Sequence, residues 1–76
     1  GALRNLVATL QSEKDKSKWP DAVKAAVLKD PQAILQFVRA VSIRGALKES
    51  GADDTLASAV ISIIDDLGVV PADVPR

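Results

Sequence analysis

The segment from Asp54 to Leu67 is apolar on every side except one narrow stripe, and this limits the folds open to the chain. Its polar residues recur at intervals of four, four and three or four: Asp54, Ser58, Ser62 and Asp65 or Asp66. That spacing is helical and not strand-like, although the run from Ala59 to Ile64 has strand-like propensity. We therefore expect a buried central helix with the other elements packed around it.

Two earlier segments also have helical spacing. The first runs from Ala2 to Ser12 and places its apolar residues on one face: Leu3, Leu6, Val7 and Leu10. It is expected to end in the polar run 13–18, which offers nothing to bury. The second begins at Trp19-Pro20, because proline suits the first turn of a helix, and is expected to stop near Lys29.

A third segment, from Pro31 to about Glu49, contains a conflict. Its first half predicts a core face made of Ile34, Phe37, Val38 and Val41. On a straight helix, however, Ile43 and Leu47 project among polar residues on the opposite side. Either the helix breaks near Ser42 to Gly45, with Ser42 as a cap, or it stays straight and is central or meets a partner there.

The ends of these helices carry typical capping residues. Asp30 precedes Pro31 as a cap, and Asp53 or Asp54 is expected to cap the last helix. Gly51 and Gly68 are expected to close the preceding helices in the left-handed conformation. These signals predict an all-α fold, a compact bundle of four or five short helices, with residues 1–70 as one domain. Residues 71–76 read as an extended, proline-containing tail or linker stub.

Composition argues against catalysis and metal chemistry. The 76 residues include no cysteine and no histidine, which removes the commonest nucleophile–base pairs and zinc ligands. The acidic pair Asp65-Asp66 does not converge on one ion, because neighbours on a helix point about 100° apart. We therefore expect a non-enzyme with no cofactor and no metal site.

The charges are balanced overall but divided along the chain. Residues 1–50 carry a net charge of about +4 and residues 51–76 about −4. The two halves could attract each other within the fold, or the asymmetry could steer a partner. The lack of cysteine and of any long apolar run predicts a soluble, intracellular and cytoplasmic protein. The lack of methionine predicts a piece of a longer protein.

These features favour a docking or adaptor domain that binds an acidic, partly apolar helix or peptide of another protein. The expected partner-binding residues are two apolar residues, one aromatic and three cations: Ile43, Leu47, Trp19, Arg39, Arg44 and Lys48. A basic face that binds nucleic acid is the alternative, and a homo-oligomer stays open. No membrane partner is expected.

Overall fold

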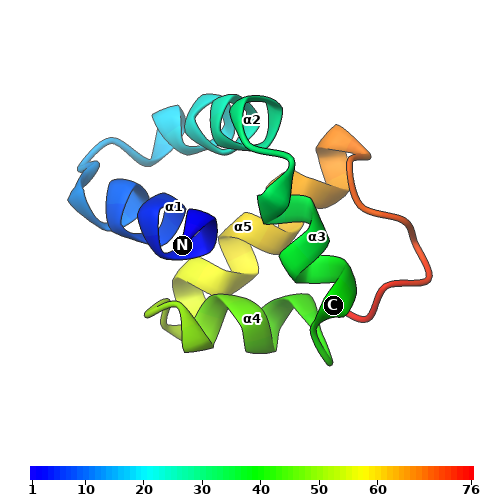
Figure 1. Ribbon diagram of the computed structural model, residues 1–76. Helices are drawn as coiled ribbons and strands as arrows, with labels where there is room; N and C mark the ends of the chain where they lie inside the picture. Colours follow the sequence, from blue (N-terminus) through cyan, green and yellow to red (C-terminus); the bar gives the residue numbers. More distant parts are fainter.

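The computed structural model describes residues 1–76 and contains five α-helices and no strand, which confirms the all-α bundle (Figure 1). The helices are α1 (Ala2–Ser12), α2 (Trp19–Lys29), α3 (Gln32–Arg39), α4 (Ile43–Glu49) and α5 (Asp54–Leu67). A short 3-10 turn, η1 (Lys16–Lys18), precedes α2. None of the helices combines the length and the apolar character that crossing a bilayer requires.

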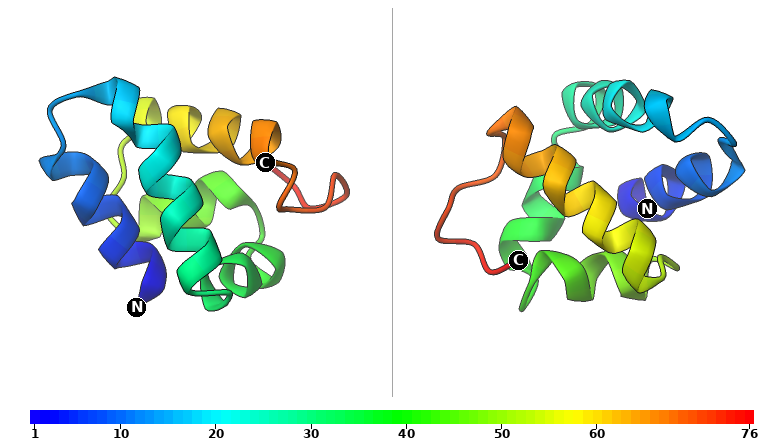
Figure 2. Two further views of the ribbon diagram at one scale, coloured as in Figure 1. Left: turned by 90° about the horizontal axis from the view of Figure 1, so that it is seen from above. Right: turned by 180° about the vertical axis from the view of Figure 1, so that it is seen from behind.

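The helices share one core, but α5 is not its single centre. α5 approaches α2 and α4, whereas α1 approaches α2, α3 and α4. α1 and α2 run side by side in opposite directions (Figure 2, left), and α5 lies nearest the viewer when the bundle is seen from behind (Figure 2, right). All buried residues are apolar, and they form one cluster drawn from every α-helix and the C-terminal tail. The expectation of a central α5 is therefore wrong, although α5 does contribute the most buried side chains of any helix.

The chain breaks between α3 and α4, as one of the two alternatives predicted. Ala40 and Ser42 are extended, and the Ser42 hydroxyl accepts a hydrogen bond from the Gly45 amide at 2.9 Å. Gly45 is itself helical and lies within the first turn of α4. A Cβ at this position would lie 3.1 Å from Ser42 Oγ, which explains why a glycine faces the capping hydroxyl.

The caps of α5 agree with the sequence. Asp53 Oδ1 accepts a hydrogen bond from the Leu56 amide at 2.8 Å, which satisfies one of the free amides of the first turn. Gly68 ends the helix with φ of +66°, the left-handed conformation that glycine adopts without strain. Gly51 likewise has a positive φ, after α4.

The core face of α3 differs from the predicted one. Ala33 and Phe37 are buried, whereas Val38 and Val41 are exposed and Ile34 is only partly covered. The spacing of apolar residues in α3 is compatible with both the predicted core face and the observed one. The neighbouring α1, α2 and α4 lie on the Ala33–Phe37 side, and this contact selects the face.

The C-terminal segment packs against the bundle. Val70 and Val74 are buried, and the backbone oxygens of Pro75 and Arg76 accept hydrogen bonds from the amides of Ile43 and Arg44 at 2.8 and 3.2 Å. The segment therefore returns from the end of α5 to the start of α4 (Figure 1). Residues 71–76 form no helix, as expected, but they are tied to the fold and do not extend away from it.

Candidate functional site

Two of the predicted partner-binding residues lie in the core. Ile43 and Leu47 are both 0% exposed, so they cannot contact a partner, and their assignment to a docking surface is wrong. The prediction continued the phase of α3 across the break. Because residues 40–42 interrupt the helix and redirect the chain, α4 starts with a new orientation and turns these two side chains inward.

Two of the predicted cations are engaged within the molecule. Arg44 Nη1 and Lys48 Nζ lie 3.8 and 3.2 Å from the same Asp54 carboxylate oxygen. Arg44 also donates to Ser58 Oγ at 3.0 Å. These contacts link α4 to α5 and use part of the positive charge that was expected to face a partner.

Trp19 lies at a junction of three helices. Its ring is partly buried and lines a hollow of about 310 Å³ with Leu10 of α1 and Leu56 of α5. Lys16 Nζ lies 5.7 Å from the ring centroid, within the range of a cation–π contact. The indole N–H is buried and has no hydrogen-bond partner. These contacts favour a packing role for Trp19.

The exposed apolar residues of α3 form a surface that the sequence prediction missed. Leu35, Val38 and Val41 are 40%, 47% and 94% exposed, and we call these three residues the α3 surface. Leu35 and Val38 lie one turn apart on the side opposite the buried Ala33 and Phe37, and Val41 follows two residues after the helix. Because α1, α2 and α4 pack on the Ala33–Phe37 side of α3, these residues stay outside the core.

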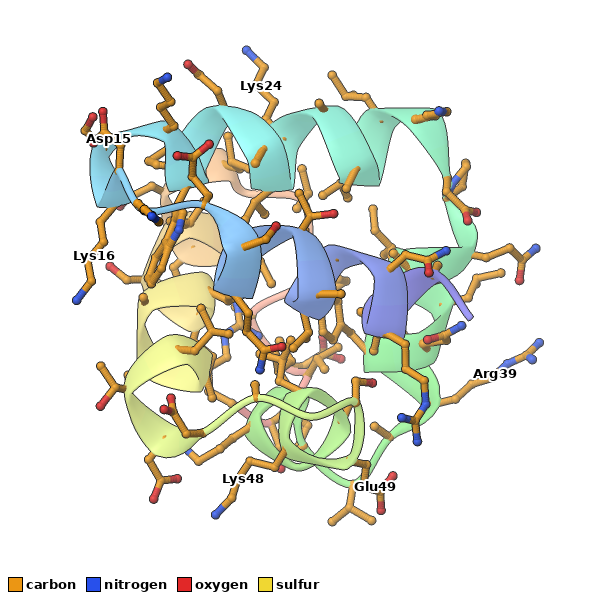
Figure 3. All side chains as sticks on the ribbon, turned by 90° about the vertical axis from the view of Figure 1, so that its left-hand side faces the viewer. Asp15, Lys16, Lys24, Arg39, Lys48 and Glu49 are labelled. Atoms are coloured by element: carbon orange, nitrogen blue, oxygen red, sulfur yellow. The ribbon has the colours of Figure 1, made fainter.

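Arg39 is the predicted cation that remains free, and it lies next to the α3 surface. Its side chain extends away from the bundle, whereas Lys48 and Glu49 lie along another edge (Figure 3). Arg39 also borders an open hollow of about 460 Å³ between α1, α3 and α4, which we call the arginine hollow. Its polar lining consists of Arg4, Gln36, Arg39, Glu49 and Ser50.

The titratable side chains show no arrangement typical of a metal centre. No group of three or more His, Cys, Asp or Glu side chains converges as metal ligands would. The pKa of Asp15 is lowered from its ordinary value, first by a hydrogen bond from the Ser17 hydroxyl and then by one from the Ser17 amide. These bonds form the cap of η1, so the shift has a local structural cause.

No family model, no curated protein and no solved structure matches this chain. The geometry of its surfaces is therefore the basis for a functional proposal. Two features of the surface adjoin each other: the exposed apolar residues of α3, and the arginine hollow, which Arg39 borders. Leu28 of α2 is also exposed, at 71%.

Proposed function

We propose that this domain is a non-catalytic docking module that binds a helix or peptide of another protein through the α3 surface. The observation that carries the proposal is the exposure of Leu35, Val38 and Val41 on and just after one short helix. Exposed apolar residues gathered in one place are typical of interaction sites. A helix that presents apolar anchors is also a common way to bind a partner helix.

The α3 surface is held in a fixed position by the core. Ala33 and Phe37 anchor the opposite side of α3, with Phe37 fully buried. The next residues are fixed by the Ser42 cap of α4. A surface that is already formed loses less conformational entropy on binding than a flexible one, which favours affinity.

Binding of nucleic acid by a basic face is supported less well. Arg44 and Lys48, two cations that a basic face would include, share Asp54, and this carboxylate would repel a nearby phosphate. Lys16 lies over the Trp19 ring. Affinity for nucleic acid depends on many free cations acting together, so these contacts weaken the alternative.

Affinity capture from a native cell extract treated with nuclease tests the proposal. The bait is the wild-type domain, the double variant Leu35→Asp/Val38→Asp, or the matched control Ser62→Asp, which adds a charge to an exposed position of α5. We expect specific proteins that wild type and Ser62→Asp retain and that the double variant loses while staying helical by circular dichroism.

Two results would contradict this docking function. The first is capture of the same proteins by all three baits, which would show that the α3 surface is not used. The second is loss of all specific capture on nuclease treatment, which would favour the basic-face alternative. Circular dichroism of each bait excludes unfolding as the cause of a lost protein.

A further inference from the structure

The arginine hollow carries positive charge that the protein itself does not neutralise. The three salt bridges of the molecule use Arg44, Lys48 and Arg76, and neither Arg4 nor Arg39 takes part in one. Arg4 donates only to the backbone oxygen of Glu49, at a long 3.4 Å. The Glu49 carboxylate also borders the hollow, so its lining keeps a net charge of about +1.

The free charge and the α3 surface are adjacent on one helix. Leu35 and Arg39 are four residues apart, so their side chains are neighbours along one edge of α3. Around the helix the order is Val38, Leu35, Arg39 and then Gln36, which faces the arginine hollow. The apolar residues are therefore followed on one side by Arg39 and then by the arginine hollow.

We propose that the occupant of this surface is an amphipathic helix of another protein, with Asp or Glu residues along one edge of its apolar stripe. This inference rests on the proposed docking function. The apolar stripe would cover Leu35 and Val38. The flanking carboxylates would reach Arg39 and, across the hollow, Arg4, and guanidinium groups bind carboxylates with two parallel hydrogen bonds.

A second copy of this chain fits the surface less well. Its acidic helix, α5, buries its main apolar side chains against the bundle, including Val60 and Ile64. The α3 surface of a second copy contains no acidic residue between Gln32 and Arg39. Neither helix therefore offers an exposed apolar stripe that has a carboxylate edge.

Three synthetic helical peptides of about 20 residues, or about 30 Å, provide the test. They share one leucine stripe and differ only at its flanking edge, which carries Glu, Gln or Lys. Each is titrated into the isotope-labelled domain and followed by the amide signals of residues 34–41. We expect the Glu peptide to bind at least about tenfold more tightly than the Lys peptide, and the preference to shrink in about 1 M salt, where charges are screened beyond about 3 Å.

Substitutions that each remove one positive charge identify the residue that recognises the carboxylates. Arg39→Gln is expected to weaken the Glu peptide about tenfold, a change of about 1.4 kcal/mol, and to leave the Gln peptide unaffected. The matched control is Lys24→Gln, which removes a cation at the outer edge of α2 (Figure 3). It should change neither affinity.

Equal binding of the Glu and Lys peptides would overturn the recognition of carboxylates and leave the docking function standing. If none of the three peptides shifts the signals of residues 34–41, the amphipathic-helix partner is wrong. The capture experiment with Leu35→Asp/Val38→Asp then decides the docking function separately. A shift of these signals with protein concentration alone would assign the surface to a second copy and would also overturn the proposal.

Discussion

Val41 and Ile43 are both β-branched and lie two positions apart, but their side chains are 94% and 0% exposed. Ile43→Ala removes buried methyl groups from the core and is expected to lower the free energy of unfolding by about 2–5 kcal/mol. Val41→Ala, the matched control, should change it by less than about 0.5 kcal/mol. Urea unfolding followed by circular dichroism measures both values.

Equal effects of these two variants, or a larger effect of Val41→Ala, would contradict the break between α3 and α4. On a straight helix, Val41 belongs to the core face and Ile43 to the wet side, so the order of the two effects would be reversed. The experiment therefore tests the residue environments and the element boundary together.

Asp15 provides a second test at the scale of single residues. The Ser17 hydroxyl, at 2.6 Å, and the Ser17 amide, at 3.0 Å, donate to its carboxylate and lower its pKa. Ser17→Ala removes the hydroxyl bond, so the pKa of Asp15 should rise toward its ordinary value. Ser12→Ala removes a hydroxyl that bonds to Thr9 instead and should leave that pKa unchanged. A carboxyl carbon NMR titration of Asp15 distinguishes the two.

The direction of the linked pH effect follows from the lowered pKa. The hydrogen bonds favour the charged carboxylate in the folded state, so Asp15 contributes stability above its unfolded pKa. That contribution is lost as the pH falls through the folded pKa. An unchanged pKa in Ser17→Ala would show that the hydroxyl bond is not its main cause.

At the scale of elements, the start of α4 depends on one hydroxyl. Ser42→Ala removes the cap of the Gly45 amide and is expected to cost about 1 kcal/mol of stability. Ser62→Ala, at an exposed position of α5 with no side-chain hydrogen bond, is the control and should cost nothing. Gly45→Ala should be more favourable in the Ser42→Ala background, because Ser42 Oγ otherwise lies 3.1 Å from the new Cβ. Additive effects in urea unfolding would contradict this contact.

The C-terminal segment is held by Arg76. Its guanidinium group lies 2.7 Å from the Asp65 carboxylate and donates to the backbone oxygens of Pro71 and Val74. Arg76→Ala should loosen the segment, so the amides of Ile43 and Arg44, which donate to Pro75 and Arg76, should exchange with solvent faster.

Hydrogen exchange measured residue by residue tests this expectation. Asp73→Asn changes an exposed side chain of the same segment that has no salt bridge, and it should leave both amides protected. The amide of Ala57, within α5, serves as the internal reference because it bonds to Asp53 at 2.9 Å. Unchanged exchange of Ile43 and Arg44 in Arg76→Ala would show that the two buried valines hold the segment without the arginine.

The sequence was sufficient to predict features that depend on local chemistry. Proline at the start of α2, Asp53 before α5 and Gly68 after it act through neighbouring atoms, and the structure confirms all three boundaries. The candidate site was not predictable in the same way. It depends on which face of α3 meets α1, α2 and α4 and on the direction that α4 takes after residues 40–42, and tertiary packing sets both. The spacing argument therefore assigned Val38 and Val41 to the core and Ile43 and Leu47 to the surface. The structure shows the opposite for both pairs.

At the scale of the whole molecule, some cations of residues 1–50 pair with carboxylates of residues 51–76 within the fold. Arg44 and Lys48 of the basic half contact Asp54 of the acidic half, which joins α4 to α5. Exposed pairs of this kind contribute about 0–1 kcal/mol each. The fold therefore depends mainly on its one apolar cluster, and Arg4 and Arg39 are among the cations that form no salt bridge within it.

A single core shared by every helix predicts cooperative unfolding. Trp19 is the only tryptophan, and it lines a hollow together with Leu10 of α1 and Leu56 of α5, so its fluorescence reports on that region. Far-ultraviolet circular dichroism reports on all helices together. Because no helix has a core of its own, we expect both signals to change at the same urea concentration. An earlier fluorescence midpoint would show that the Trp19 junction opens while the other helices persist, and the apolar cluster would then consist of two units that unfold separately.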